Sequence, residues 1–361
     1  SLTTTSAVAM QGDINVDETS GLLQLTDLTV TTNGANTQIV QVRNTSGAIS
    51  VDASKNFGND NVTLAATGAT QDVNFGTSTL TTTGTMSVSA TDTITTTTAD
   101  AVAEVSAASL TLNAVTGIGS SANHFDVIAS TVNATNTTSG GIFIDSLGGT
   151  SAGVGDVNFS SVHANTAGNL VLTGATNTTL TDVDAANGTI DIDVTIGNLI
   201  ATDVATGTNN QIDLTTVTSG DVQLGIVTAG SGAVNVTSVG NITDTDAAAT
   251  NDVTGGTVSF SAASGIGATG ANDSVEVIAS TVNATNSTSG GIFLNSLGGT
   301  AAGAGAVNFS SIHANTAGNI ELDAVTATTL TDVDAANGSI DADVAGAAMT
   351  AGERVGGGKA A

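Results

Sequence analysis

The 361-residue sequence contains no proline, no cysteine, no tryptophan and no tyrosine. The absence of cysteine excludes disulfide bonds and thiolate chemistry. Proline removes a hydrogen-bond donor from a sheet and is confined to sheet edges and bulges. At an average usage of roughly 5%, a chain of this length would hold ~18 prolines. Their complete absence therefore predicts a backbone that is paired with neighbouring strands along most of its length.

Basic residues are nearly absent as well. Four Lys and Arg stand against 32 Asp and Glu, giving a formal net charge of −28, and no base lies between Lys55 and Arg354. Proteins bind nucleic acid by placing cations against phosphates, so we exclude nucleic acid and anionic membrane surfaces as direct partners. No stretch approaches the ~20 apolar residues that a membrane-spanning helix needs. We therefore expect no direct insertion into a membrane.

The sequence is rich in Gly, Thr, Ala, Val, Asn and Asp, which favours strands joined by turns. Short runs alternate apolar and polar residues, as in residues 156–161 (DVNFSS), 169–174 (NLVLTG) and 189–194 (TIDIDV). Alternation with a period of two predicts strands that bury one face. The predicted inward-facing residues include Ile142, Ile144, Val157, Phe159, Leu170, Leu172, Ile190 and Ile192.

The turn residues that open these runs recur at a regular interval. Along the best-formed stretch they are Gly168, Gly188, Asn210, Gly232 and Gly256. This rhythm predicts an all-β, elongated parallel β-helix (a solenoid) with ~20–24-residue coils, about 17 coils in total. A string of immunoglobulin-like sandwiches is the rival fold, but it usually needs buried aromatic residues and hairpin-paired strands. The chain has only eight Phe, which favours the β-helix.

A long internal duplication supports a repetitive architecture. Residues 126–194 return at 276–344 with 53 of 69 positions identical. We predict a single β-helix array over residues 1–344 that contains this duplicated module, followed by a Gly/Ala-rich tail or linker at 345–361. The segment 99–112 has the Ala and Glu content of a helix, and we expect either a short helix or a bulge there.

The rungs TSGGIFIDSLGG and HANTAGNLVLTGATNTTLTDVDAANGTIDIDV, with their second copies, resemble the repeat tracts of filamentous-haemagglutinin-like bacterial surface adhesins. Proteins of that family are exported by two-partner secretion or as autotransporters. The resemblance covers roughly residues 40–344 and is one of rung rhythm and composition. It implies a shaft-like protein that is secreted or displayed at the cell surface. The sequence opens on Ser1, and we expect a processed product or a segment of a longer chain.

Clustered aspartates are the only candidate for a metal site. Acidic, oxygen-only loops with glycine suit a hard cation such as Ca²⁺. An EF-hand needs acids at defined positions, which this sequence does not supply, so two interpretations stay open: a turn leading into a strand with outward acids, or calcium at selected pairs. No other cofactor is expected. The candidate ligands are Asp182, Asp184, Asp191, Asp193, Asp332, Asp334, Asp341 and Asp343.

Catalytic chemistry has little support in the sequence. His124, His163 and His313 are isolated, whereas a metal site or a triad needs convergent groups. Paired acids alone can serve glycoside hydrolysis, but these clusters recur with the module, as a structural feature would. We predict that the protein is not an enzyme.

The function we expect is that of a structural shaft in an extracellular filament or surface adhesin. Because the end coils of a stacked array expose unpaired backbone groups, we also expect self-association end to end into fibres. One alternative is an adhesin module that binds a glycan or host surface through its Thr/Asn/Asp face. Another is an ice-binding β-helix, although the Thr-rich stretches are irregular.

Overall fold

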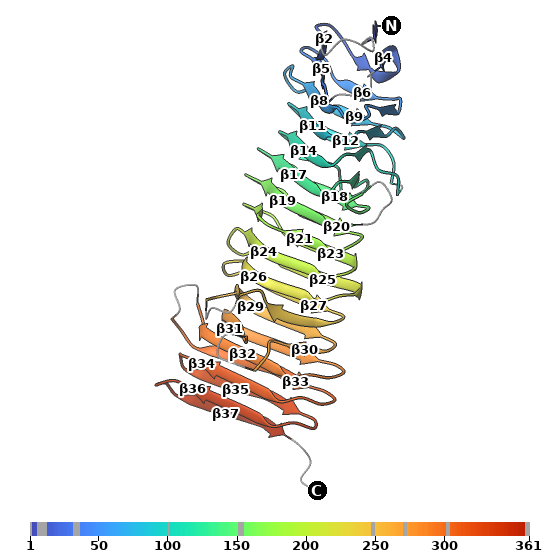
Figure 1. The fold of residues 1–361 in the computed structure, drawn as a ribbon. Coiled ribbons are helices and arrows are strands. Elements are labelled where there is room, and N and C mark those ends of the chain that lie inside the picture. The colour runs from blue at the N-terminus through green and yellow to red at the C-terminus, as the bar shows by residue number, and fades with distance from the viewer. Residues whose placement is uncertain are drawn as a thin grey trace. The chain divides into compact units, whose positions relative to one another are not determined.

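The protein is described here by a computed structural model, and the chain is drawn in Figure 1. The described residues are 2–5, 13–31, 37–99, 101–150, 155–246, 250–269, 273–300 and 304–357.

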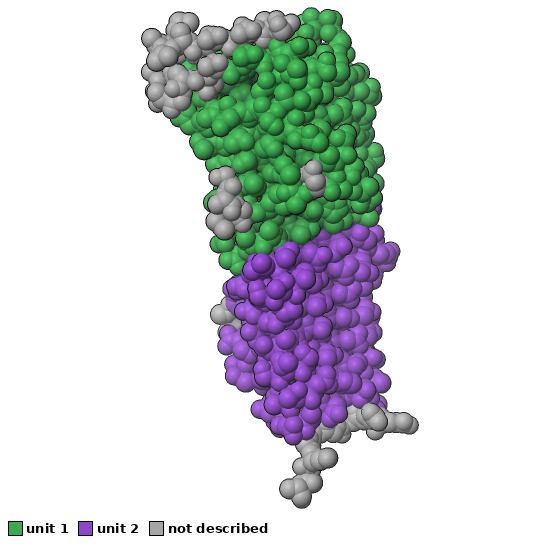
Figure 2. Space-filling model, turned by 90° about the vertical axis from the view of Figure 1, so that its right-hand side faces the viewer, with its two compact units in different colours: residues 1–177, 183–186 green, residues 178–182, 187–361 purple. Residues whose placement is uncertain are grey.

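The chain divides into two compact units, coloured separately in Figure 2. Unit 1 contains residues 1–177 and 183–186, and unit 2 contains residues 178–182 and 187–361. The elements of unit 1 are β1 (Leu2–Thr5), β2 (Ile14–Glu18), β3 (Leu23–Gln24), η1 (Leu25–Asp27), β4 (Leu28–Thr31), β5 (Ile39–Asn44), β6 (Ile49–Val51), β7 (Lys55–Asn56), β8 (Asn61–Ala66), β9 (Val73–Phe75), β10 (Leu80–Thr81), β11 (Thr85–Ala90), β12 (Thr93–Thr96), β13 (Val105–Ser106), β14 (Ser109–Ala114), β15 (Gly117–Ile118), β16 (Phe125–Ile128), β17 (Thr131–Asn136), β18 (Ile142–Ser146), β19 (Val157–Ala164), β20 (Leu170–Gly174) and β22 (Val183–Ala185). The elements of unit 2 are β21 (Thr178–Leu180), β23 (Ile190–Ile196), β24 (Leu199–Thr206), β25 (Ile212–Ser219), β26 (Val222–Thr228), β27 (Ala233–Ser238), β28 (Asn241–Asp244), β29 (Val253–Ala262), β30 (Gly265–Ile266), β31 (Val275–Asn286), β32 (Ile292–Gly298), β33 (Val307–Ala314), β34 (Ile320–Ala324), β35 (Thr328–Ala335), β36 (Ile340–Val344) and β37 (Met349–Gly357).

Within each unit the strands pair in parallel, each with the strand one coil further along the chain (Figure 1). Val234 of β27 pairs with Val258 of β29, which pairs with Val282 of β31, so each of these coils spans 24 residues. The predicted parallel β-helix is confirmed: the described residues of each unit form a β-solenoid, with about 14 turns in the two units together. The expected coil number was too high because some coils are longer, as where Ile142 pairs with Leu170.

Alternating side chains of these strands form the core. The eight residues predicted to face inward are each at most 1% exposed. Burying an aliphatic or aromatic side chain contributes roughly 1.5–3 kcal/mol, and stacking like residues on successive coils repeats that contribution along each unit. The inward positions are mainly Val, Ile, Leu and Ala with a few Phe, among them Phe159 and Phe309, both fully buried.

Two segments differ from the sequence-based expectation. The stretch 99–112 contains β13 and the start of β14 and no helix among its described residues, because Val105 and Leu110 pair with Val127 and Val132 on the next coil. The segment assigned to a tail includes β37, which pairs in parallel with β35. Ladder pairing overrides the helix-favouring composition at 99–112.

Asparagine and glycine build one corner of the coils. In unit 1, the Asn136 amide donates from Nδ2 to the carbonyls of Ser139 (2.6 Å) and Gly140 (2.8 Å). Gly168, with φ of +130°, lies directly against that turn: a Cβ added there would sit 1.4 Å from the Gly140 carbonyl oxygen. In unit 2, Gly318 approaches the Gly290 carbonyl in the same way, at 1.6 Å from the added Cβ. Neither position accommodates a side chain.

No helix within the described residues is long and apolar enough to cross a bilayer.

Candidate functional site

The first predicted aspartate pair lies on the outer face of unit 2. Asp191 and Asp193 are on β23, and Asp191 pairs in register with Asp213 on β25. Burial, followed by the charges of Asp193 and Asp213, raises the pKa of Asp191. Asp213 accepts hydrogen bonds from Gln211 Nε2 (2.5 Å) and Asn235 Nδ2 (2.8 Å). Amide donors therefore satisfy part of this acidic row.

The second copy of this pair, Asp341 and Asp343, lies on β36. These residues stand in register with Glu321 and Asp323 on β34. Burial, followed by the charges of Asp343 and Asp341, raises the pKa of Asp323. Like charges directly opposite one another on neighbouring strands are destabilising, so this row costs stability unless protons or cations neutralise it.

The remaining predicted aspartates lie near histidines. In unit 2, His313 Nε2 is 3.2 Å from Asp332 Oδ2, and His313 is in register with Asp334.

In unit 1, His163 is in register with Asp184, with 3.9 Å between Nε2 and Oδ2. Asp182 belongs to unit 2, where its charge, after burial, raises the pKa of Asp203. His163 and His313, which were expected to be isolated, therefore each lie near an acid.

Across the described parts of the chain, the six candidates outside the 182–184 pair do not join a group of three convergent acid or histidine ligands. These six are Asp191, Asp193, Asp332, Asp334, Asp341 and Asp343. Calcium at these residues stays a prediction.

Unit 2 contains a convergent acidic group that the sequence analysis missed. One carboxylate oxygen from each of Asp244, Asp252 and Glu276 lies within 4.8 Å of the others. Asp252 is 2% exposed and Glu276 is fully buried, while Asp244 is half-buried at the end of β28. We call this set the three-acid group.

Hydrogen bonds from the fold hold one oxygen of each carboxylate in this group. Asp252 Oδ2 accepts from the Glu276 backbone N–H (2.8 Å), and Asp244 Oδ1 accepts from the Asp246 backbone N–H (2.8 Å). Glu276 Oε1 accepts from Ser274 Oγ (3.0 Å) and Asn295 Nδ2 (3.3 Å). The carboxylates are thus oriented before any ligand arrives.

Burial dominates the electrostatics of the three-acid group. It is the largest cause that raises the pKa of Asp252 to about 9; the Glu276 N–H opposes the shift, and the charges of Asp244 and Glu276 add to it. Burial likewise raises the pKa of Glu276 and of Asp244. Removing an ion from water costs several kcal/mol unless a partner compensates.

Unit 1 has a related group at the same place in its coils. Glu104 precedes β13 as Asp252 precedes β29. The backbone N–H of each donates to the backbone carbonyl of the acidic residue one coil later, Asp126 or Glu276 respectively. The Asp126 N–H donates to Glu104 Oε2 (2.6 Å), matching the Glu276 to Asp252 bond. The third position differs, because Thr96 stands where unit 2 has Asp244, and its hydroxyl donates to Glu104 Oε1 (2.6 Å). We call this the hydroxyl-capped group.

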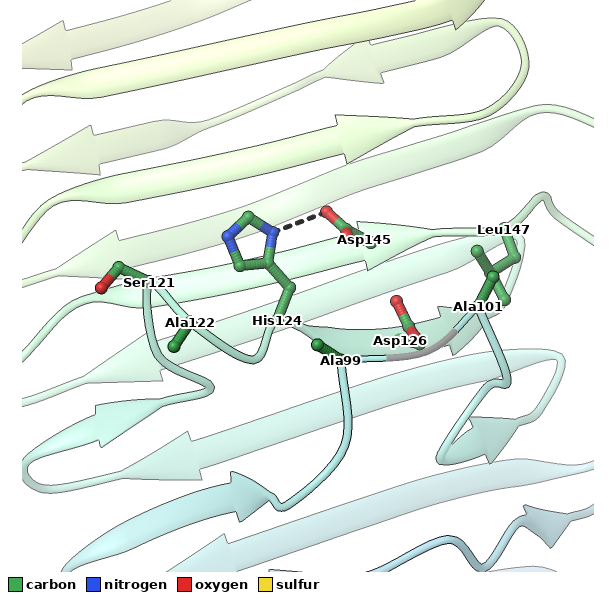
Figure 3. A pocket seen from close by; sticks show the side chains of 8 residues that line it. All are labelled: Ala99, Ala101, Ser121, Ala122, His124, Asp126, Asp145 and Leu147. Atoms are coloured by element: carbon green, nitrogen blue, oxygen red, sulfur yellow. Dashed lines mark hydrogen bonds and ion pairs between the residues drawn. The ribbon is translucent and has the colours of Figure 1, made fainter.

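A hollow of about 400 Å³ adjoins the hydroxyl-capped group (Figure 3). Asp126, Asp145 and His124 line it, and Figure 3 shows His124 turned toward Asp145, with 2.8 Å between Nδ1 and Oδ1. The His124 ring also lies 5.7 Å from that of Phe143, centroid to centroid. Ser121 lines the hollow, but within the described structure it makes no hydrogen bond to His124, so a nucleophile–base contact is not formed.

A weak signal for the buried acids is visible in hindsight. Asp126 and Glu276 open the duplicated segments DVIAST and EVIAST, where an acid stands beside residues that alternate into the core. Their partners, Glu104 and Asp252, lie 22 and 24 residues earlier, which is one coil. Pairing acids by coil length would have brought them together.

Comparison of the chain with protein families, with curated proteins and with solved structures found no match.

Proposed function

We propose that this chain is a structural shaft of an extracellular filament or surface adhesin, as its resemblance to filamentous-haemagglutinin-like repeats implies. The observation that carries the proposal is the parallel ladder that runs from coil to coil within each unit over a closed apolar core. Every coil is held by backbone hydrogen bonds and side-chain stacking to the next. Such an array resists deformation along its length without disulfides.

The acidic exterior suits this role. With 32 acids and four bases, neighbouring shafts repel one another and stay soluble. Lateral aggregation is a hazard for any protein with exposed strand edges. We therefore infer a secreted or surface-displayed protein that makes its specific contacts at coil ends.

Self-association end to end is part of the proposal. On β34 the inward-facing Ile320 and Leu322 are at most 1% exposed, whereas the inward positions of β36, Ile340 and Ala342, are partly exposed. We propose these inward positions of β36 as the surface on which another coil stacks. A second copy that stacks its first coils on this surface would extend both the ladder and the core.

Negative-stain microscopy and analytical ultracentrifugation of the purified chain test the shaft proposal. We expect concentration-dependent species that lengthen by whole chains. Replacing Ile340 with Asp should suppress this association, while replacing the exposed Val325 with Asp serves as the control. Monomers at high concentration with an intact C-terminal coil would contradict end-to-end assembly.

A second candidate is an adhesin module that binds glycans. The hollow lined by His124, Asp126 and Asp145 favours it, since a concave surface with convergent polar groups suits a ligand rich in hydroxyls. A glycan array with the wild-type chain and Asp145→Ala tests this idea. A shaft without ligands gives no specific signal with either protein.

A further inference from the structure

We propose that Asp244, Asp252 and Glu276 form a binding site for a divalent cation of the oxygen-preferring class, Ca²⁺. This site is distinct from the aspartate pairs that the sequence suggested, and it is independent of the shaft role.

The first argument is the presence of buried oxygens that accept no hydrogen bond. Glu276 is fully buried, and its Oε2 has no donor among the described residues apart from the acid proton of Asp252; the same holds for Oδ2 of Asp244. Asn251, beside Asp252 in the sequence, has a third such oxygen, Oδ1. Buried polar atoms in folded proteins nearly always have a partner, so each exception requires an explanation. Oxygens that carry negative charge and lack donors are what a cation binds.

The second argument is charge. The three carboxylates carry up to three negative charges, and residues 56–353 contain no Lys or Arg. The protein therefore supplies no permanent cation in this stretch. Neutralisation has to come from outside, either from protons or from a metal ion. A divalent ion compensates two of the charges while leaving all three oxygens as ligands.

The third argument is geometry. Ca²⁺ takes 6–8 oxygens at about 2.3–2.6 Å, so oxygens on opposite sides of the ion lie roughly 4.6–5.2 Å apart. The three carboxylate oxygens, all within 4.8 Å of one another, do not exceed this largest separation and can therefore share one ion. Three carboxylates provide up to six oxygens if each binds through both. Mg²⁺ prefers shorter distances and keeps its water ligands, which makes Ca²⁺ the better occupant.

The fourth argument is the contrast with unit 1. There Thr96 donates a hydroxyl proton to Glu104, and one fewer acid converges at this position of the coil. In unit 2 the equivalent Asp244 cannot donate when ionised, and it adds charge instead. Asp in place of Thr at this position removes an internal hydrogen-bond donor and adds a ligand oxygen. A bound cation stabilises the buried carboxylates of unit 2, as the Thr96 hydroxyl stabilises the Glu104 carboxylate in unit 1.

Isothermal titration calorimetry of the full chain, stripped with EDTA and titrated with CaCl₂, tests the site. We expect one site per chain, and a Tm that rises by roughly 5 °C when Ca²⁺ is in large excess over its dissociation constant. Asp244→Thr copies the Thr96 arrangement and should fold, yet it should weaken binding at least ~10-fold because it removes a charged ligand. Asp27→Asn, at an exposed acid of unit 1 that is not among the candidate ligands, should leave the isotherm unchanged.

The reciprocal variant strengthens the test. Thr96→Asp should give unit 1 a third acid and raise the stoichiometry toward two. The proposal is overturned if Ca²⁺ produces neither heat nor a Tm shift, or if Asp244→Thr binds as the wild type does. A response to MgCl₂ that equals the response to CaCl₂ would overturn the assignment of Ca²⁺.

Discussion

The hydroxyl-capped group of unit 1 and the three-acid group of unit 2 occupy the same place in their coils and solve the same problem differently. Both place an acid before a strand and a second acid one coil later, joined by the same backbone hydrogen bond. In unit 1 the third residue is a donor, Thr96, and in unit 2 it is Asp244. All three residues differ in type between the units, and the exchange at the third position separates a group with an internal donor from one that needs an external cation or proton.

The residues around the two groups also differ between the units. Next to the hydroxyl-capped group, Asp126 is in register with Asp145, which lies against His124. In unit 2 the equivalent positions are Asn295 and Ser274, and both donate to Glu276. Each unit therefore buries two acids and adds a half-buried third, which is Asp145 beside Asp126 in unit 1 and Asp244 beside Asp252 in unit 2. Duplicated coils can keep one backbone while their buried electrostatics diverge.

The largest expected effect concerns the core that both modules share. Phe159→Ala and Phe309→Ala should each lower the free energy of unfolding by about 3–5 kcal/mol, since both rings are fully buried. Urea unfolding in EDTA measures the change, with the half-exposed Phe143→Ala as a milder control. Costs that differ widely between the two Phe variants would show that the cores are not equivalent.

The next effect distinguishes the two acidic groups by pH. The pKa of Asp252, about 9 in the folded protein, lies above its ordinary value near 3.9. The folded state therefore keeps a proton that the unfolded state loses, and stability should fall between pH 4 and 9 by at most about 1.4 kcal/mol per pH unit. Urea midpoints in EDTA from pH 5 to 9 measure the slope. Asp252→Asn should flatten it, and an unchanged slope would count against the assignment.

A smaller effect tests the donor in unit 1. Thr96→Val keeps the shape of the side chain but leaves Glu104 Oε1 without that hydroxyl, which should cost about 1–3 kcal/mol. Thr97→Val on the exposed face provides the control. Equal urea midpoints for the two variants would mean that the hydroxyl does not stabilise Glu104.

The smallest effect concerns the outer aspartates. Asp193→Asn and Asp343→Asn occupy equivalent positions of the duplication, and each removes a charge that raises the pKa of a neighbouring acid. We expect each to stabilise the protein at pH 7 by no more than about 0.5 kcal/mol, because exposed charges are screened. Thermal melts at low and high salt measure it. Destabilisation on removal would instead point to a cation held at these rows.

The fold was predictable because its signal is periodic. Alternation marked Ile142, Phe159 and Leu172 as inward-facing, and all three are fully buried. The Ala and Glu content of residues 99–112 suggested a helix, but Val105 pairs with Val127 on the next coil and this part of the segment is a strand.

The buried acids were not predicted, because they are single residues spaced one coil apart. Asp182 and Asp191 attracted attention by clustering in the sequence, whereas Asp252 and Glu276 meet only when the chain is wound with the observed register. In a solenoid, acids that are close together in the sequence are not the ones that come together in space. The length of each coil is the information that was missing.

The glycine corner has a consequence for how such a chain changes in length. Because Gly168 and Gly318 each rest against the backbone of the preceding turn, successive coils lock together at a fixed spacing there. An insertion of part of a coil would place a residue with a side chain at this glycine contact, and the side chain would push the two coils apart. Whole coils are therefore the smallest unit that evolution can add or delete without penalty, and a 150-residue step between copies is an increment that returns every corner to its place.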